Sequence, residues 1–151
     1  LNSESHIKIR IQDHTIQSYN LQLFLVPDDQ LNFNELLWSG EKELKLQENH
    51  FIFSHKLIGE GISKNFIANQ KVLISKPKSM TQKIKVHAKQ PSRDLKYLFQ
   101  KYKIPVWERS NYPCVYIENR LVAVLNIGID DEVRAKKNEE GFLFTYKKPQ
   151  F

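Results

Sequence analysis

The sequence predicts an α+β fold in which strands dominate, and three observations lead to this expectation. Several short segments alternate apolar and polar residues with a period of two, which is typical of half-buried strands. One segment in the second half, residues 92–104, instead spaces its apolar residues like the buried stripe of a helix. The chain has 151 residues, 40% of them hydrophobic and 26% charged, so it can bury a core as one or two compact domains.

The first half of the chain predicts strands. Residues 6–12 alternate isoleucines with Lys8 and Arg10, so one face of this segment would be apolar. Residues 31–38 fit a short helix or an extended piece, and the sequence leaves both open. Another strand is expected at residues 19–26, followed by a turn at Pro27, Asp28 and Asp29. Further strands are expected at residues 43–46, 51–57 and 71–75. A tight turn at Gly59, Glu60 and Gly61 follows the second of these three.

Composition and charge both change at Lys76-Pro77-Lys78-Ser79, where we place a domain boundary between residues 1–76 and residues 77–151. Beyond this boundary, residues 82–88 alternate again and predict another strand, with Ile84 and Val86 on one side. The other side of this expected strand carries Lys83, Lys85 and His87. One of its faces would therefore be cationic.

A helix is expected next, with Ser92 as its N-cap and Asp94 in the first turn, where a carboxylate complements the helix dipole. The apolar stripe, expected in the core, consists of Leu95, Leu98, Phe99 and Tyr102. A different face carries Arg93, Lys96, Gln100 and Lys103, with Tyr97 nearby. Because Pro105 cannot continue a helix, this one should end near Ile104, and Trp107 should pack beneath the Pro105 turn.

The last third of the chain predicts strands again. Residues 115–117 and 121–127 are apolar segments joined around Asn119, which indicates a hairpin, and residues 142–146 form a final strand candidate. Cys114 begins the first of these strands, and we expect it to be a small buried core residue rather than a nucleophile. A lone cysteine forms no internal disulfide, which fits a reducing cytoplasm.

The positive charge of the chain is concentrated in its middle. The whole sequence has a net charge of +6, yet residues 76–109 alone hold ten Lys and Arg against two acidic residues, a net charge of +8. Residues 1–75 hold seven basic and nine acidic residues, and residues 110–151 hold six of each. A cationic region of this kind is the electrostatic footprint expected for a phosphate-bearing partner.

Other chemistries find little support in the sequence. The five glycines are never adjacent and form no phosphate-binding loop. His50 and His55 would lie on opposite faces of a strand, and Asp130-Asp131-Glu132 reads as a solvated turn or helix start rather than a set of metal ligands. No apolar run approaches the roughly 20 residues needed to cross a bilayer, and no signal segment begins the chain. No catalytic or metal-binding residue is therefore assigned.

Cations interleaved with rings remain as the main functional signal. Lys and Arg neutralise phosphates, and exposed aromatic rings stack on bases or riboses. The same pattern also fits a β-rich protein-interaction module whose basic face docks an acidic partner, or a lysine-rich helix face that is merely solvated. The residues by themselves leave these readings open.

Several short motifs in fixed order resemble a known family. They are Leu95-Lys96-Tyr97-Leu98-Phe99-Gln100, Ile104-Pro105-Val106-Trp107-Glu108-Arg109, Pro113-Cys114-Val115-Tyr116 and Leu121-Val122-Ala123-Val124, followed by Gly128. With them, residues 83–128 resemble the C-terminal domain of bacterial tRNA(Ile)-lysidine synthases, whose order is L-K-K-L-F-Q, I-P-P-W-x-R, P-L-x-Y, L-V-A-V and a glycine. The chain departs from the family at Val106, which replaces a second proline, and at Lys89-Gln90-Pro91-Ser92-Arg93, which replaces a glycine-bearing basic loop.

This resemblance implies a fold and a function. The fold would consist of packed β layers with a basic helix, similar to a domain of the phenylalanyl-tRNA synthetase β chain. Residues 1–76 would be the strand-rich segment that precedes the tRNA-binding domain. The family uses ATP, with magnesium, to adenylate the wobble cytidine of an isoleucine tRNA, and lysine then displaces AMP. That chemistry belongs to an N-terminal domain with an S-G-G-x-D-S loop, which is not in this sequence.

The resemblance therefore implies a tRNA-binding part of a cytoplasmic ligase that is not catalytic alone and needs no cofactor itself. The absence of an initiator Met at Leu1 suggests a longer parent chain. Its partner would be tRNA(Ile), contacted at the acceptor stem, with lysine and ATP as substrates of the full-length enzyme; a homodimer is left open. The residues expected to contact tRNA are Lys85, Lys89, Arg93, Lys96, Lys103 and Arg109.

Overall fold

A computed structural model describes residues 8–11, 14–19, 22–27 and 30–149, and side chains from residue 30 onward. The chain divides into two compact units, Leu1–Gln30 and Leu31–Phe151. The first unit is an antiparallel sheet in the order β1-β2-β3. Its strands are β1 (Lys8–Ile11), β2 (His14–Tyr19) and β3 (Gln22–Pro27).

The first unit confirms two expected strands and adds one that was not predicted. Strand β1 lies within residues 6–12, whose ends fall outside the described residues. The strand expected over residues 19–26 is confirmed as β3, which begins later, at Gln22, because Tyr19 ends the unpredicted strand β2. Strand β2 has the sequence HTIQSY, which contains too few apolar residues to show an alternating pattern. Asp28 and Asp29 of the expected turn lie outside the described residues.

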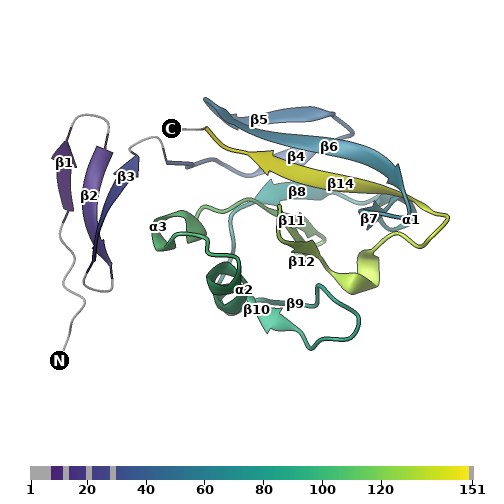
Figure 1. Ribbon diagram of the computed structural model, residues 1–151. Helices are drawn as coiled ribbons and strands as arrows, with labels where there is room; N and C mark the ends of the chain where they lie inside the picture. Colours follow the sequence, from purple (N-terminus) through teal and green to yellow (C-terminus); the bar gives the residue numbers. More distant parts are fainter. Residues whose placement is uncertain (1–7, 12–13, 20–21, 28–29, 150–151) are drawn as a thin grey trace. The chain divides into compact units, whose positions relative to one another are not determined.

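The second unit contains two antiparallel sheets that pack face to face (Figure 1). The five-stranded sheet has the order β13-β12-β11-β8-β4 and consists of β4 (Leu36–Trp38), β8 (Val72–Ser75), β11 (Cys114–Ile117), β12 (Arg120–Val124) and β13 (Gly128–Ile129). The four-stranded sheet has the order β5-β6-β14-β7 and consists of β5 (Glu43–Gln47), β6 (His50–Ile58), β7 (Ile62–Ser63) and β14 (Glu140–Lys147). The strand-rich α+β prediction is confirmed.

The core between the two sheets is apolar. Trp38 of β4 packs edge to face on Phe144 of β14, with ring centroids 4.9 Å apart, and Ile52 of β6 and Ile74 of β8 are buried in the same cluster. Residues 31–38, which the sequence left open between helix and strand, are extended and contribute β4. The turn at Gly59 and Gly61 is confirmed, and both residues have a positive φ that glycine adopts without strain.

A second core lies on the other face of the five-stranded sheet, where α2 (Leu95–Lys101) packs. Leu95, Leu98 and Phe99 of this helix are fully buried beside Cys114 and Tyr116 of β11. Strand β11 is thus buried on both faces, with Val115 and Ile117 in the first core. Full burial of each Leu or Phe contributes about 1.5–3 kcal/mol, so three anchors hold a helix of seven residues firmly.

The ends of α2 differ from the prediction. Asp94, not Ser92, is the N-cap: its carboxylate accepts the backbone N–H of Tyr97 at 2.8 Å. The helix ends at Lys101 rather than near Ile104, because Lys103 has a φ of 57° and the Ile104 N–H bonds to the Phe99 carbonyl. This is a Schellman motif, which closes a helix and turns the chain away. Tyr102, expected in the core, is therefore 39% exposed.

The remaining short elements were partly foreseen. The alternating segment 82–88 forms a strand only at β9 (Lys83–Ile84), which pairs with β10 (Arg93–Asp94). The hairpin between β11 and β12 is confirmed, but β12 ends at Val124, before a turn at Asn126 with a φ of 64°. Other helical turns are α1 (Lys64–Ile67), α3 (Val106–Arg109), in which Trp107 is half-buried, and the 3₁₀ turn η1 (Asp131–Val133).

The boundary expected between residues 76 and 77 stays a prediction about the sequence. In space, β8 before it and β11 after it are paired from Ser75↔Cys114 to Val72↔Ile117. Both sides of the boundary therefore contribute strands to one sheet of the second unit.

Candidate nucleic-acid interface

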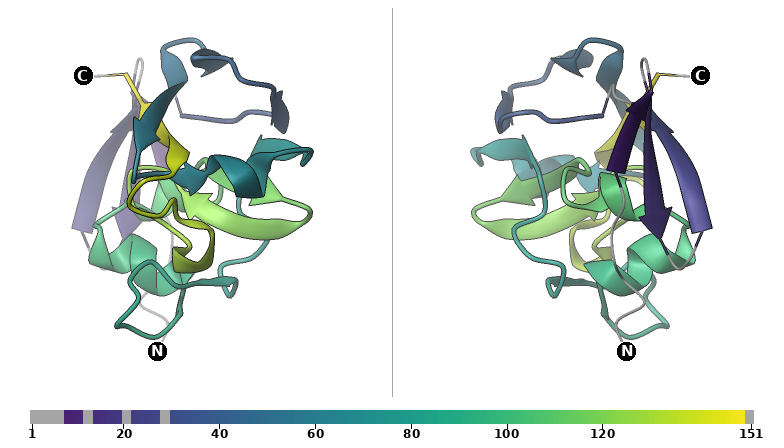
Figure 2. Two further views of the ribbon diagram at one scale, coloured as in Figure 1. Left: turned by 90° about the vertical axis from the view of Figure 1, so that its right-hand side faces the viewer. Right: turned by 90° about the vertical axis from the view of Figure 1, so that its left-hand side faces the viewer.

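Residues 76–109, here called the basic segment, surround α2 on the outer face of the five-stranded sheet. Figure 1 and the turned views of Figure 2 show α2, β9 and β10 on the side of this sheet away from the four-stranded one. Backbone bonds place the segment closely: Leu95 N–H donates to the Gln82 carbonyl at 3.0 Å, and Lys96 N–H donates to the Met80 carbonyl at 3.2 Å. The beginning of α2 is thus tied to the chain before β9.

Strand pairing brings cations from separate positions together. In the register of β9 and β10, Arg93 lies opposite Ile84 and Asp94 lies opposite Lys83. Lys96 follows directly in the first turn of α2. Lys83, Arg93 and Lys96 are exposed, and they belong to the adjoining elements β9, β10 and α2.

The structure keeps all six predicted contact residues at the surface, at different exposures. Lys89, in the loop between β9 and β10, is exposed like Arg93 and Lys96, and Lys85 is half-buried beside β9. Lys103 and Arg109 lie beyond the other end of α2. Arg93 and Lys96 therefore lie at the beginning of α2, Lys85 and Lys89 lie in the segment between β9 and β10, and Lys103 and Arg109 follow the end of the helix.

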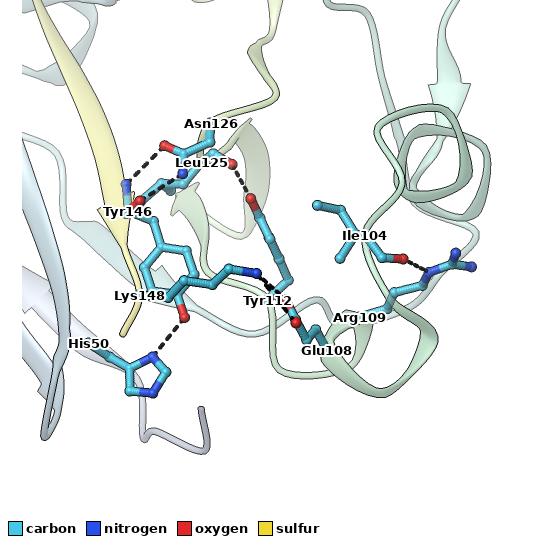
Figure 3. Close-up of polar contacts among 9 residues, drawn as sticks. All are labelled: His50, Ile104, Glu108, Arg109, Tyr112, Leu125, Asn126, Tyr146 and Lys148. Atoms are coloured by element: carbon cyan, nitrogen blue, oxygen red, sulfur yellow. Dashed lines mark hydrogen bonds and ion pairs between the residues drawn. The ribbon is translucent and has the colours of Figure 1, made fainter. Parts of the chain in front are cut away.

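Arg109 is held more tightly than the other predicted contact residues. Its Nε donates to the Ile104 carbonyl at 2.8 Å, and the side chain is half-buried. Glu108, its neighbour in α3, forms a salt bridge with Lys148, whose Nζ lies 3.1 Å from Oε1 (Figure 3). These two contacts fix the orientation of α3 beside the end of α2.

The cations of the basic segment have no carboxylate partner among the residues whose side chains are described. Among the described residues, none of its ten Lys and Arg side chains forms an ion pair, and its own two acids are engaged elsewhere, Asp94 at the helix cap and Glu108 with Lys148. Cations outside the segment are often paired, for example Arg120 with Asp130 at 3.5 Å. Within the part of the chain whose side chains are described, the positive charge of this segment therefore has no carboxylate partner, and seven of the ten side chains are exposed.

Two exposed rings accompany these cations. Tyr97 is 40% exposed, and the Arg93 guanidinium lies 4.6 Å from its ring centre. The Lys101 ammonium group lies 5.7 Å from the centre of the Tyr102 ring. The prediction that Tyr97 lies near the cations is confirmed. Rings with cations on them are a surface that stacks on bases or riboses while phosphates pair with the charges.

Tyr116 positions part of the basic segment, a role that was not predicted from the sequence. The Tyr116 hydroxyl donates to Gln82 Oε1 at 2.6 Å and accepts the Lys78 N–H at 3.1 Å, so a core strand fixes the path of residues 78–82. Burial raises the pKa of this hydroxyl, which stays protonated and able to donate. The tyrosine of the Pro113-Cys114-Val115-Tyr116 motif was the available signal, but nothing local identifies Gln82 as its partner.

The cysteine and histidine side chains that were considered for catalysis or metal binding do not form such a site in the described residues. Cys114 is fully buried, and burial raises the pKa of its thiol, as expected for a core residue. His50 is buried against Tyr146, whereas His55 is exposed. Groups of three or more potential metal-ligating side chains do not occur within the described ranges. None of the helices in the described part of the chain is long and apolar enough to span a membrane.

Comparison with known proteins gives consistent matches. Residues 76–145 match the family model of the TilS substrate C-terminal domain. The chain is 25% identical, over 95% of its length, to the tRNA(Ile)-lysidine synthase of Buchnera aphidicola subsp. Baizongia pistaciae, and 23% identical, over 97% of its length, to that of Nitrosomonas europaea. A match to the tRNA(Ile)-lysidine synthase of Actinobacillus succinogenes is 41% identical over 26% of this chain and 9% of that protein.

The chain spans 32% of the length of the Buchnera and Nitrosomonas relatives. A solved structure, the crystal structure of a TILS C-terminal domain, superimposes with a TM-score of 0.55 at 15% identity, covering 78% of this chain and 100% of that one. This likeness shows the fold: strand-rich, with packed antiparallel sheets and few helices. The expected likeness to the phenylalanyl-tRNA synthetase β chain stays a prediction.

Proposed function

We propose a tRNA-binding role for this chain, whose residues 76–145 belong to the TilS substrate C-terminal domain family. The chain would be the C-terminal portion of a tRNA(Ile)-lysidine synthase, working in the cytoplasm. It would bind tRNA(Ile) at the acceptor stem and take no part in bond chemistry itself. The full-length enzyme would use ATP and magnesium to join lysine to the wobble cytidine through a separate adenylating domain.

The observation that carries this proposal is the uncompensated charge of the basic segment. The ten cationic side chains of this segment have no carboxylate partner among the described residues, while six cations elsewhere in the second unit form ion pairs. Holding like charges together costs stability unless a polyanion neutralises them. A nucleic-acid stem supplies such charge, and its binding releases the counterions that surround it.

The kind of contact also fits a double-stranded RNA stem. A-form RNA is recognised mainly by its shape, its 2′-hydroxyl groups and its phosphates, because its major groove is too narrow for side chains. Arg93 and Lys96 are presented by a strand and a helix anchored on the core, so their positions are fixed before binding. We assign phosphate contacts to Lys85, Lys89, Arg93, Lys96, Lys103 and Arg109.

Titration of the chain with an isoleucine tRNA at several salt concentrations tests this function. The affinity should fall steeply with salt, and Lys96→Gln should make the log–log slope shallower by about one. Lys71→Gln serves as the matched control, because Lys71 is exposed and lies outside the basic segment. An unchanged affinity and slope for Lys96→Gln would refute the assignment of this residue.

The alternative is a protein-interaction module with a basic docking face. It predicts that tRNA binding is weak and equal for Lys96→Gln and Lys71→Gln. Replacing other cations of the basic segment should then not lower the affinity for tRNA either. The exposed rings of Tyr97 and Tyr102 beside the cations favour the RNA reading, since base and ribose faces stack on rings.

A further inference from the structure

A small pocket lies beside the end of α2, within reach of the basic segment. It has a volume of about 210 Å³, and its walls come from the Schellman turn, the turn after β12 and the end of β14. Its apolar and aromatic lining consists of Tyr102, Ile104, Tyr112, Ile127 and Tyr146. Pockets for drug-sized ligands typically measure 300–1,000 Å³, so this one suits a single flat ring system.

The polar side chains of Tyr112, Asn126 and Tyr146 in the pocket walls form hydrogen bonds within the protein (Figure 3). The Tyr112 hydroxyl donates to the Leu125 carbonyl at 2.7 Å, and the Tyr146 hydroxyl shares a hydrogen bond of 2.8 Å with His50 Nδ1. The Asn126 amide bonds to both the N–H and the carbonyl of Tyr146, at 3.0 and 2.7 Å. The pocket therefore offers ring and aliphatic faces to a ligand rather than a pattern of donors and acceptors.

One cation, Lys148, lines this apolar pocket, and three others contact or adjoin its lining residues. Lys148 lines it, with its ammonium group held 3.1 Å from Glu108 (Figure 3). Lys103 stands between the lining residues Tyr102 and Ile104 in the chain, and Lys101 lies over the Tyr102 ring. Arg109 bonds to the Ile104 carbonyl. A ligand matching these surroundings has an uncharged flat ring joined to negatively charged groups on the outside.

We propose that the pocket holds one unpaired nucleobase of the bound RNA, with the adjoining phosphates at Lys101 and Lys103. This inference rests on the proposed function. Bases inside a stem are stacked on each other and cannot enter, so the occupant comes from a single-stranded nucleotide next to the stem. Since the walls provide stacking faces and few free hydrogen-bonding groups, the pocket accepts any base. The surface thus selects a junction between a duplex and a single strand.

Three RNA hairpins with the same stem, each closed by a non-nucleotide linker in place of a loop, test this proposal in binding measurements with the whole 151-residue chain. One is blunt, one has a four-nucleotide single-stranded 3′ extension, and one has the same extension built from abasic nucleotides. The extended hairpin should bind more tightly than the other two by about 5-fold to 150-fold, the range for stacking of one base. Because the abasic extension keeps the phosphates and lacks the bases, it separates the contribution of the base to binding from that of the phosphates.

Tyr102→Ala should abolish the preference for the extended hairpin, and Tyr102→Phe should keep it because the ring remains. Ile58→Ala is the control, because Ile58 is 62% exposed and lies outside both the basic segment and the pocket lining. Equal binding of the intact and abasic extensions would overturn the proposal while leaving the proposed function intact. Failure of all three hairpins to bind would overturn both.

Discussion

The guanidinium of Arg93 stacks on the exposed ring of Tyr97, 4.6 Å from its centre, across the beginning of α2. Asp94, between them in sequence, turns its carboxylate to the Tyr97 N–H instead of pairing with Arg93. The ring therefore orients the guanidinium without neutralising it. A cation held in this way loses less conformational entropy when a phosphate binds than one on a free side chain.

Arg93→Gln should weaken tRNA binding and make the salt dependence shallower by about one unit of slope. Tyr97→Leu should weaken binding by a smaller factor and leave the slope unchanged, since the charge remains. Fluorescence anisotropy with labelled tRNA across a range of salt concentrations measures both quantities. A Tyr97→Leu variant that changes the slope as much as Arg93→Gln would contradict the roles assigned to the pair.

Asp94→Ala should lower the free energy of unfolding by about 1 kcal/mol, because it removes the side-chain cap of α2. Ser92→Ala should change it by no more than a few tenths of a kcal/mol, since Ser92 is exposed and lies outside the helix. Urea unfolding followed by circular dichroism compares the two variants. Equal losses, or a larger loss for Ser92→Ala, would show that the cap is assigned to the wrong residue.

The choice between these two caps illustrates what the sequence could and could not predict. Ser92 and Asp94 are both good N-cap residues, and local sequence gives no reason to prefer one. The pairing of β10 with β9 decides the matter, because it keeps residues 93 and 94 extended. The position of Tyr102 was missed for a similar reason: the apolar stripe predicts a buried ring only if the helix continues past Lys101, and the Schellman motif stops it.

The periodic parts of the fold were predictable. The spacing of Leu95, Leu98 and Phe99 identified the buried face of α2, and the positive-φ turn at Asn119 appeared as expected between two apolar strands. The concentration of cations was also visible in the sequence. Whether a carboxylate compensates each cation was not, since that depends on partners distant in the chain, such as Glu108 for Lys148.

A pH-dependent contribution to stability is expected from Glu139. The Ser63 hydroxyl, followed by the Lys136 N–H and the Asn65 amide, donates to its carboxylate and lowers the pKa below the ordinary value of 4.5. Because the folded-state pKa is the lower one, this stabilisation is present above about pH 4.5 and is lost as the pH falls through the folded value.

Glu139→Gln should therefore be less stable than the native chain at pH 7, and the difference should shrink at pH 3. Urea unfolding at the two pH values measures it. Glu35→Gln is the control, because Glu35 is exposed and the described residues give its carboxylate no hydrogen bond or ion pair. If Glu139→Gln differed from the native chain by the same free energy of unfolding at both pH values, the Glu139 carboxylate would not be the source of the pH-dependent stability.

The thiol of Cys114 should be unreactive in the folded protein. It is fully buried, and burial raises its pKa, so it is neither accessible nor ionised at neutral pH. Labelling with Ellman's reagent at pH 8 should be slow without denaturant and complete within seconds in concentrated urea. Rapid labelling of the native chain would place Cys114 at the surface and contradict the core beneath α2.

The most direct test of the central claim is a footprint of lysine acetylation with and without an isoleucine tRNA, read by mass spectrometry. Lys89, Lys96 and Lys103 are exposed residues of the basic segment. Lys42, Lys71 and Lys137 are also exposed and lie outside it. We predict that tRNA protects the first three and leaves the second three reactive. Uniform protection of all six, or protection confined to Lys42, Lys71 and Lys137, would contradict an RNA interface around α2.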